Sequence, residues 1–483
     1  MTIKDLSPKE VWNYFYEITQ VPRPSKKEGK IIEYIEGVSQ KHKISIKKDK
    51  VGNLLLFKEA TKGYEDFPTV ILQAHIDMVC EKNSNIKHDF EKDPIKTVIN
   101  GEWLCAEGTT LGADNGIGVA AALAVITSKD VEHGPVECLF TVDEETGLTG
   151  ANALQKDFMT GKILLNLDSE DEGEIFIGCA GGKNTTVTFN YSAENASKTD
   201  NYFKIAVSGL NGGHSGGDIH KGLGNANKIL ARFLYQLLNK YEFTLAEIEG
   251  GNLHNAIARE AFALIGTDAK NKEKIRALLN VFAADIEKEL KSVDSNVKLT
   301  METAAPPEKN IPNALKTNLI HALLACPHGV IGMSHDIEGL VETSTNLASV
   351  KMTGNNKIVI ITSQRSSIES AKNAVADQVA AVFKLAGAKV MHGDGYPGWM
   401  PNADSRILEV AKNSYRKLFG KDAKIMAIHA GLECGLFLEK YPYLDMISFG
   451  PTLRSVHSPD ERIEIKTVDM WWKHLLDILK NVQ

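Results

Sequence analysis

The chain is poor in cysteine, in proline and in long apolar runs. Its six cysteines are scattered without a CxxC pair, which favours buried thiols in a reducing cytoplasm over a disulfide framework. Only 15 prolines and a hydrophobic fraction of 43% are typical of a globular protein rather than a disordered one. The longest apolar run, Gly116 to Ile126, is too short to cross a bilayer. These absences predict a globular protein without a membrane partner.

A strong net charge is also missing. The chain has 55 basic and 62 acidic residues and a net charge of -7, which gives no support for a nucleic-acid partner. Its N-terminal segment lacks the charged start and apolar core of a signal peptide, so we expect a cytoplasmic location. Ser7, Pro8 and Glu10 instead predict a helix with Pro8 at its first position and a capping box between Ser7 and Glu10.

Short β-rich runs alternate with helical stretches up to about Gly182, which predicts an α/β fold with a mostly parallel central sheet flanked by helices. The same alternation of β-rich and helical segments returns from about Pro397. Because 483 residues exceed one ordinary core, we expect a catalytic domain formed by residues 1–185 and 397–483 around an inserted domain. The candidate central strands are Val70–Leu72, Val136–Thr141 and Lys162–Leu165, and Gly116–Ile126 is a candidate helix rich in small residues.

Residues 186–396 differ, because long amphipathic helices there separate alternating strands. We expect this segment to form an α+β lid domain. Residues 202–290 and 313–385 have similar successions of strands and helices, which indicates an internal duplication. In these two halves Asn255 and Asn346 are expected at similar places, as are Lys270 and Arg365.

A histidine and an aspartate end the first central strand. His75 and Asp77 should lie at its carboxyl end, where open α/β sheets bind their ligands. His75 could bind a metal through one ring nitrogen while Asp77 accepts a hydrogen bond from the other. Because such tripeptides are frequent by chance, a loop histidine beside a solvated aspartate is the plain alternative.

Asp114 lies between glycines immediately before the small-residue helix. It could simply cap that helix, and taken alone this is the better interpretation. The glycines, however, allow close backbone approach, and a carboxylate has two oxygens that can bridge two cations. Asp114 is therefore the candidate bridging ligand.

Three consecutive acids, Asp143, Glu144 and Glu145, follow the next strand. Like charges this close repel, and a cation would offset the repulsion, although a solvated loop is the alternative. With a metal present, one glutamate could be a ligand while its neighbour accepts a proton from water.

Asp168 follows a further apolar run, and His457 lies in a polar loop near the C-terminus. Asp168 is favoured over the acids at 170–172 because it is nearest the strand end, whereas His457 alone would be only a surface histidine. Jointly, two histidines and three or four carboxylates predict a two-metal hydrolase site. The chain also lacks the G-x-S-x-G elbow and the P-loop lysine of other enzyme classes.

These segments resemble the motifs of the co-catalytic zinc dipeptidases, above all the cytosolic aminoacyl-histidine dipeptidase family, also called the peptidase D or cytosol non-specific dipeptidase family. The resemblance runs nearly end to end. The matching segments are Val21-Pro-Arg-Pro-Ser25, His75-Ile-Asp77, Gly112-Ala-Asp114-Asn115-Gly116, Asp143-Glu144-Glu145-Thr-Gly147, Asn166-Leu-Asp168-Ser-Glu170, His429-Ala-Gly-Leu-Glu433-Cys-Gly435 and His457-Ser-Pro.

The resemblance implies two divalent metal ions per chain, with Zn²⁺ expected and Mn²⁺ or Co²⁺ as alternatives. The implied metal ligands are Asp114 as the bridge, His75 and Asp168 in one site, and Glu145 and His457 in the other. The implied catalytic residues are Glu144, as the general base, and Asp77, which orients His75.

Substrate-binding residues are implied in and near the lid. His214 would face the developing oxyanion with Asn255 beside it, although its glycine-rich segment also suits a plain tight loop. Arg365 would bind the substrate's C-terminal carboxylate, or be a surface arginine. Glu433 would meet the substrate's amine. In dimeric relatives the lid histidine comes from the neighbouring subunit, whereas a duplicated lid can supply it in cis, so the chain is expected to be a monomer or a homodimer.

The leading hypothesis is a cytoplasmic metallo-dipeptidase of broad specificity that acts on small peptides, Xaa-His among them. One alternative is an aminoacylase-like enzyme that hydrolyses N-acyl amino acids. Another is a non-catalytic protein that binds metal and peptides, against which the second glutamate, Glu144, argues.

Overall fold

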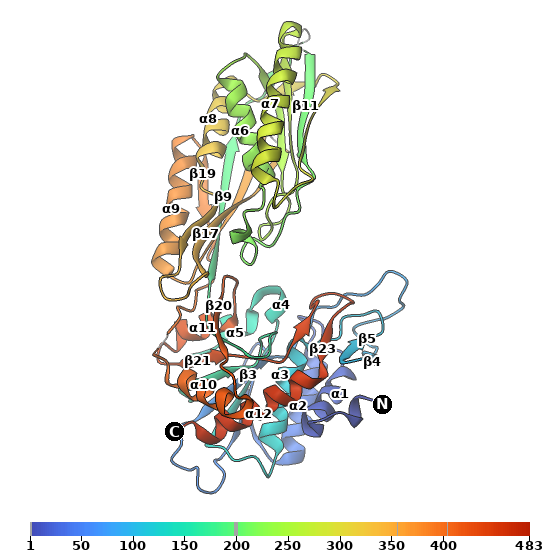
Figure 1. Cartoon of the computed structure of the whole chain (residues 1–483), viewed down its shortest axis with the longest axis vertical. Coiled ribbons are helices and arrows are strands. Elements are labelled where there is room, and N and C mark those ends of the chain that lie inside the picture. Colours follow the sequence, from blue (N-terminus) through green and yellow to red (C-terminus); the bar gives the residue numbers. More distant parts are fainter. Residues whose placement is uncertain (1, 198–200, 355, 403) are drawn as a thin grey trace. The chain divides into compact units, whose positions relative to one another are not determined.

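The computed structural model describes residues 2–197, 201–354, 356–402 and 404–483 (Figure 1). The chain divides into two compact units, each described here by itself. Unit 1 comprises Met1–Gly178, Pro401–Ala427 and Leu432–Gln483, and unit 2 comprises Cys179–Met400 and Ile428–Gly431.

The central sheet of unit 1 has a parallel centre. Strand β3 pairs in parallel with β6 and β7, and β7 pairs in parallel with β21, whereas β1, β2 and β8 pair antiparallel on the flanks. Every residue of β3, β6 and β7 is buried, as expected for strands covered on both faces. The predicted α/β class is confirmed, with antiparallel outer strands that the pattern had not indicated. In sheet order the strands are β1 (Ser45–Lys48), β2 (Leu54–Lys58), β6 (Val136–Thr141), β3 (Val70–His75), β7 (Ile163–Asn166), β21 (Asp445–Ser448), β8 (Glu174–Cys179) and β20 (Lys424–Ile428).

The helices of unit 1 include the predicted small-residue helix, α3, which is buried along nearly its whole length. The predicted start of α1 is wrong. The first helical bond runs from Trp12 N–H to the Pro8 carbonyl, so Pro8 precedes the helix, and no side chain caps it. A capping box instead joins Thr2 and Asp5 around the 3-10 turn Ile3–Asp5. The helices are α1 (Lys9–Thr19), α2 (Gly29–His42), α3 (Ala113–Thr127), α4 (Glu144–Gly147), α5 (Thr149–Ala153), α10 (Arg406–Phe419), α11 (Glu433–Lys440) and α12 (Ile465–Asn481).

A small antiparallel sheet in unit 1 joins two distant parts of the chain. Strands β4 (Thr97–Asn100) and β5 (Trp103–Ala106) pair with β23 (Arg462–Glu464), which pairs with β22 (Leu453–Arg454). The loop between β22 and β23 carries His457, and β5 leads into residues 107–114, here called the Asp114 loop, which end in the irregular first turn of α3. The sheet therefore brings these two loops into one region.

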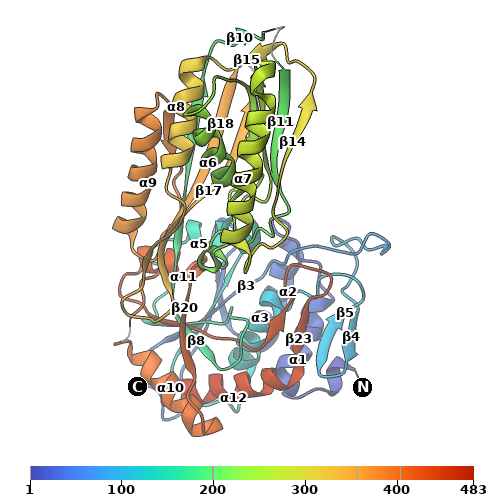
Figure 2. The ribbon, with the colours of Figure 1, turned by 45° about the horizontal axis from the view of Figure 1, so that its top comes forward.

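Unit 2 is built on one antiparallel sheet with α6, α7, α8 and α9 over one face (Figures 1 and 2). A two-stranded ribbon of β10 (Glu194–Asn195) and β15 (Lys309–Asn310) and two short 3-10 turns, η2 (Ile219–Lys221) and η3 (Ala269–Asn271), complete its described elements. The helices are α6 (Ala226–Leu238), α7 (Lys272–Leu290), α8 (Asn313–Ala325) and α9 (Glu369–Leu385). The strands, in sheet order, are β14 (Lys298–Ala304), β11 (Asn201–Ser208), β13 (Ala261–Thr267), β12 (Thr244–Gly250), β17 (Val341–Thr353), β18 (Lys357–Ser366), β9 (Gly181–Asn190) and β19 (Lys389–His392), and β16 (Gly329–Met333) pairs with β17.

The order of these strands is symmetric about the β12–β17 pair. Outward from β12 the strands are β13, β11 and β14, and outward from β17 they are β18, β9 and β19. Helix α7 joins β13 to β14 as α9 joins β18 to β19, and α6 precedes β12 as α8 precedes β16 and β17. The halves differ at their start, because α6 follows β11 in the chain whereas β9, in the equivalent sheet position, comes before the first half. This arrangement is that of two related halves.

The predicted residue equivalences between the halves are wrong. Asn255 lies in the loop between β12 and β13, whereas Asn346 lies within β17; Lys270 lies in η3, whereas Arg365 lies within β18. The halves drift out of register because β17 has 13 residues and β12 only 7.

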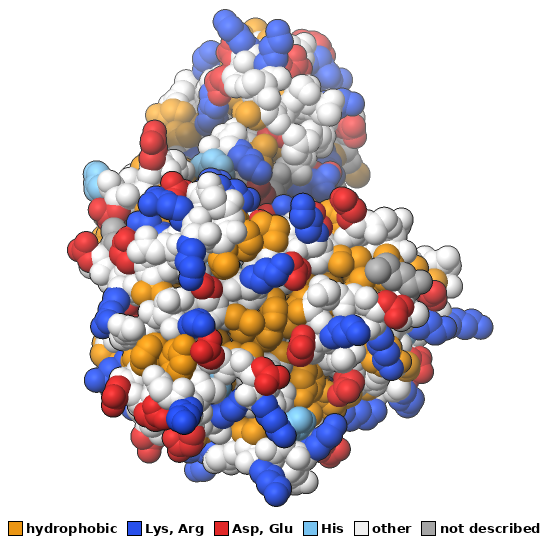
Figure 3. All heavy atoms as spheres, turned by 60° about the horizontal axis from the view of Figure 1, so that its bottom comes forward, with side chains coloured by type: hydrophobic (Ala, Val, Ile, Leu, Met, Phe, Trp, Pro, Cys, Tyr) orange, Lys and Arg blue, Asp and Glu red, His pale blue; other side chains and the backbone are white. Residues whose placement is uncertain are grey.

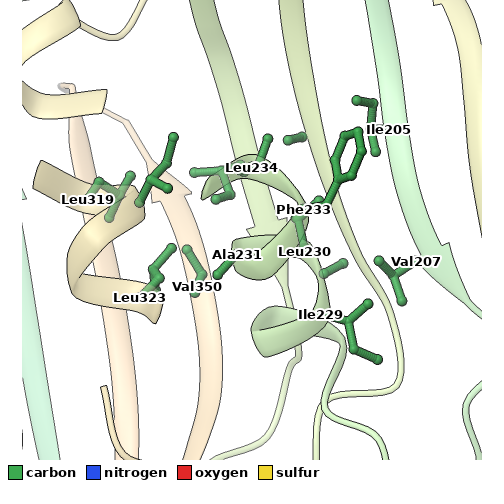
Figure 4. Packing of buried hydrophobic residues seen from close by; sticks show 14 of the residues in the cluster. Ile205, Val207, Ile229, Leu230, Ala231, Phe233, Leu234, Leu319, Leu323 and Val350 are labelled. Atoms are coloured by element: carbon green, nitrogen blue, oxygen red, sulfur yellow. The ribbon is translucent and has the colours of Figure 1, made fainter. Parts of the chain in front are cut away.

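The core of unit 2 forms where these helices meet the sheet. In Figure 4, Leu234 and Ala231 of α6 face Leu319 and Leu323 of α8, while neighbouring α6 residues face β11. All four side chains are buried, which makes this packing a main source of stability.

On the face drawn in Figure 3, lysine and arginine alternate with aspartate and glutamate around apolar patches. This face therefore has no continuous positively charged patch of the kind that binds a polyanion. None of the helices in the described ranges has the length and apolar character needed to span a membrane.

Candidate active site

The sheet of unit 1 gathers three of the predicted acidic segments at one edge. His75 is the last residue of β3, Asp143 to Glu145 follow β6, and Asp168 follows β7. Because β3 lies between β6 and β7 and is parallel to both, the carboxyl ends of these strands adjoin.

Asp114 lies at the centre of the polar residues at this edge. Its Oδ1 is 3.2 Å from His75 Nε2, and its Oδ2 is 3.2 Å from His457 Nε2. Asp168 Oδ1 is 3.5 Å from His75 Nε2, and Glu145 Oε2 is 3.0 Å from His457 Nε2. The structure thus brings together all five residues predicted as metal ligands, in two groups that share Asp114. We call these five residues the acidic cluster.

Burial and mutual repulsion dominate the electrostatics of this cluster. Burial and neighbouring carboxylates raise the pKa of Asp168 to about 6 and the pKa of Glu144 well above its usual range. Hydrogen bonds with Asp114 and Glu145 raise the pKa of His457 to about 11. Burial lowers the pKa of His75, but Asp168 and Asp114 outweigh it and raise that pKa. The carboxylates therefore have a strong demand for positive charge.

The donors fit a divalent metal pair. Two imidazoles and three carboxylates are the ligands that zinc and similar ions accept. Ligand atoms of His75, Asp114 and Glu145 lie within 4.8 Å of one another, and Glu145 Oε1 is buried without a hydrogen-bond partner. In the part of the chain that the structure describes, no lysine or arginine forms an ion pair with a carboxylate of the cluster.

Asp77 connects the end of β3, which carries His75, with the segment that carries Glu144 and Glu145. Its Oδ1 lies 3.3 Å from His75 Nδ1, outside good hydrogen-bonding geometry. It also accepts hydrogen bonds from the backbone N–H groups of Glu144 and Glu145 and from Ser25 Oγ. Burial raises its pKa, but the neighbouring His75 and the hydrogen bonds from Ser25 and Glu144 outweigh burial and lower that pKa to about 2. Asp77 is therefore a fixed anion behind His75.

Glu461 is a functional candidate that the sequence prediction missed. Its buried carboxylate accepts the backbone N–H groups at the start of α3, at 2.7 Å from Leu111, 2.9 Å from Gly112, 2.7 Å from Ala113 and 3.3 Å from Asp114. Glu461 lies four residues after His457, so it fastens the His457 loop to the Asp114 loop. An acid soon after a candidate histidine, opposite a helix start that attracts anions, was the available signal.

Arg23 was quoted only as part of a motif, yet it holds the same region. Its buried guanidinium donates to the carbonyls of Ile76, Asp77 and Gly112. Gly112 has a φ of 70°, and a Cβ there would lie 2.5 Å from the guanidinium, so only glycine fits this close approach.

Glu433 lies in unit 1 and contacts side chains of β3 and β6. Its Oε2 accepts hydrogen bonds from Gln73 Nε2 at 2.6 Å and Thr141 Oγ1 at 2.8 Å, whereas its Oε1 is buried without a partner. Burial raises its pKa to about 7, and its charge in turn raises the pKa of Glu144. The structure thus places Glu433 among the groups around the acidic cluster.

His214 lies in the glycine-rich loop of unit 2 after β11. Its Nδ1 accepts the backbone N–H of Gly217 at 3.0 Å, which assigns the ring proton to Nε2. Burial and Arg365 lower its pKa, which favours the neutral ring. Its loop is tied to the β12–β13 loop, because Ser215 N–H donates to the Asn255 carbonyl.

Arg365 and His429 lie beside this loop in unit 2. A Cβ on Gly216 would be 3.2 Å from Arg365 Nε and 2.2 Å from the His429 carbonyl. His429 Nε2 and Ser344 Oγ are 2.7 Å apart, and Arg365 Nη1 donates to Tyr396 Oη at 2.9 Å. Burial and Arg365 lower the pKa of His429 to about 3, so its ring is neutral. We call His214, Arg365, Tyr396 and His429 the donor cluster.

Comparisons with known proteins agree with this architecture. Residues 71–481 match the model of peptidase family M20/M25/M40. The chain is 44% identical over 480 residues to the cytosol non-specific dipeptidase of Escherichia coli strain K12, covering 99% of each chain. The crystal structure of an aminoacylhistidine dipeptidase from Vibrio alginolyticus has 43% identity and a TM-score of 0.93, covering 100% of this chain and 98% of that one. A Staphylococcus aureus tripeptidase, at 16% identity and a TM-score of 0.58 over 99% of each chain, shares the fold.

Proposed function

Because this chain belongs to peptidase family M20/M25/M40, we propose that it hydrolyses dipeptides with two divalent metal ions and a glutamate base. The observation that carries the proposal is the acidic cluster, in which two histidine–carboxylate pairs share Asp114. Broad specificity, with Xaa-His dipeptides among the substrates, is supported by the names of the two relatives that are more than 40% identical.

In this proposal His75 and Asp168 would hold one ion, Glu145 and His457 would hold the other, and Asp114 would contribute to both sites. Zn²⁺ is the expected metal, and Mn²⁺ or Co²⁺ suit the same donors. When bound, the ions would polarise the scissile carbonyl and lower the pKa of a water molecule that attacks it.

Glu144 is the proposed general base. Its carboxylate accepts the proton of the attacking water and returns it to the leaving amine. Support comes from its place in the chain: its backbone N–H donates to Asp77, and the next residue, Glu145, faces His457. Asp77 in turn keeps His75 oriented, with its carboxylate behind His75 Nδ1.

His214 is the proposed donor to the oxyanion that develops on the peptide carbonyl. Because its Nδ1 accepts a backbone N–H, its Nε2 carries the proton that such a donor needs. Asn255 is proposed to contact the substrate beside it, in a loop that the Asn255 carbonyl joins to the His214 loop.

Arg365 and Glu433 are proposed to select the length of the peptide. A guanidinium can grip the C-terminal carboxylate with two N–H groups, and a carboxylate can accept the N–H groups of the free amine. The unpartnered Nε of Arg365 and the unpartnered Oε1 of Glu433 support these roles.

We propose a cytoplasmic location, in line with the name of the Escherichia coli relative. The two related halves of unit 2 support a lid histidine that acts in cis, so the enzyme could work as a monomer or as a homodimer.

A panel of dipeptides, with tripeptides, N-acetyl dipeptides and N-acetyl amino acids as controls, tests the proposal on enzyme of defined metal content. Release of both amino acids from free dipeptides, with the controls cleaved far more slowly, is the expected result. Faster hydrolysis of N-acetyl amino acids would instead favour an aminoacylase, which the named relatives do not support.

A further inference from the structure

Arg365 is a buried cation without an anion in unit 2. Its side chain is only 7% exposed, yet among the described residues no carboxylate forms an ion pair with it. A charge removed from water in this way is costly unless hydrogen bonds or a counter-ion compensate it. Within the described ranges, the only hydrogen-bond partner of its side chain is the Tyr396 hydroxyl, at 2.9 Å, and its Nε has no partner.

Tyr396 lies in a loop and is only partly buried, yet its backbone and its ring are both held in place. Its backbone exchanges two hydrogen bonds with Gly182, at 2.8 and 3.0 Å, and its carbonyl accepts a third from Lys372 Nζ at 2.7 Å. Its ring lies between two glycines, because a Cβ on either Gly182 or Gly431 would come within 2.7 Å of ring atoms. The hydroxyl oxygen is therefore a fixed acceptor.

The register of the sheet places the Tyr396 ring directly beside Arg365. Arg365 on β18 is paired with Gly182 on β9 and with Ser344 on β17. The missing side chain at Gly182 thus makes room for the Tyr396 ring next to Arg365. The nearby histidines, His214 and His429, have lowered pKa values and do not compete with the guanidinium as cations.

From this geometry we infer that Tyr396 is a positioning residue that determines specificity: by fixing the guanidinium of Arg365, it makes recognition of the peptide's C-terminal carboxylate selective. The inference rests on the proposed dipeptidase function. A hydrogen bond from one N–H group leaves the other N–H groups of the guanidinium to meet an anion in one fixed orientation, and less ordering entropy is lost when the carboxylate binds.

The test compares Tyr396→Phe with Tyr202→Phe, a control in the same unit that removes a hydroxyl bonded to Asn310 and Ser197. Substrates are a dipeptide and the same dipeptide with a C-terminal amide. For Tyr396→Phe, KM for the free dipeptide should rise about 10-fold with little change in kcat, because the lost bond involves a charged donor and acts on binding. Values for the amide, and all values for Tyr202→Phe, should stay near those of the wild type.

Two further variants separate positioning from a general structural effect. Gly182→Ala displaces the ring while keeping the hydroxyl, and should reduce the preference for the free carboxylate in the same way. In an Arg365→Lys background, Tyr396→Phe should have no further effect, because Tyr396 acts through the guanidinium.

An unchanged preference for the free dipeptide over its amide in Tyr396→Phe would overturn the inference, and so would an undiminished Tyr396→Phe effect in the Arg365→Lys background. Both outcomes leave the proposed function intact, provided that the wild type cleaves free dipeptides. A wild type that cleaves none refutes the proposed function and this inference together.

Discussion

The acidic cluster of unit 1 and the donor cluster of unit 2 are opposites in charge and in construction. The acidic cluster places three carboxylates around two histidines, and backbone N–H groups and hydroxyls support it. The donor cluster has a single unpaired guanidinium among neutral rings and hydroxyls. One site demands cations and the other an anion, so variants of the two clusters should affect different steps.

Metal removal should have the largest effect, and it should act through the acidic cluster alone. Exhaustive chelation leaves its carboxylates with no cation to offset their repulsion, so dipeptide hydrolysis should fall to background and the melting temperature should decrease. Added Zn²⁺, Mn²⁺ or Co²⁺ should restore both. Full activity after chelation, with metal content verified as zero, would reject the two-metal proposal.

Glu144→Gln should come next. Gln cannot accept the proton of the attacking water, so kcat should fall on the order of 10³- to 10⁴-fold. Metal content measured by elemental analysis should match the wild type, because Glu144 is not a proposed ligand. The matched control is Glu33→Gln, which changes an exposed acid on α2 of the same unit and should retain activity. Comparable kcat values for the Glu144→Gln variant and the wild type would remove Glu144 from its role as the base.

The two clusters also differ in how far the sequence predicts them. Four of the five ligands of the acidic cluster sit in short motifs at the end of a strand or at the start of a helix, so strand prediction alone brings His75, Asp168 and Glu145 together. The donor cluster draws on β18 and on three separate loops. Only its glycine-rich loop carries a local signal, and neither Tyr396 nor His429 was selected as a site residue.

The fold shows the same contrast. Strand β6, which is a short and mostly apolar run, was predicted with its observed bounds. The register between the two halves of unit 2 could not be predicted, because it depends on strand lengths and on β16, which no repeat pattern reveals. Glu461 was missed for a related reason: its partners are backbone N–H groups 347 to 350 residues earlier in the chain, and its place after a candidate histidine does not identify them.

Arg365→Lys tests the contrast between the two clusters through the donor cluster of unit 2. An ammonium cannot reproduce a two-pronged contact with a carboxylate, so kcat/KM for dipeptides should fall roughly 100-fold, mainly through KM. Metal affinity should be unchanged, since no ligand of the acidic cluster is altered. A loss of bound metal in this variant would contradict the separation of the two clusters. Arg276→Lys, which changes an arginine on α7 of the same unit, is the control.

Glu461→Ala should have the smallest effect on catalysis and the most specific effect on metal binding. Without the carboxylate, the N–H groups at the start of α3 lose their acceptor and the Asp114 loop is no longer fastened to the His457 loop. Metal affinity, measured by competition with a chelator, should weaken roughly 10- to 100-fold, as for other groups that orient metal ligands. At saturating metal, kcat should largely recover and KM should not change.

The control for this variant is Asp460→Ala, which removes the adjacent but exposed carboxylate and should leave the affinity for metal as it is. Equal metal affinities for Glu461→Ala and the wild type would mean that the small sheet of β4, β5, β22 and β23 holds the two loops together without Glu461. A kcat that stays low at saturating metal would instead mean that Glu461 also sets the position of Asp114 once the metals are bound. The first result would assign the cluster's geometry to the strands around it, whereas the second would give the buried Glu461 carboxylate a further part in that geometry.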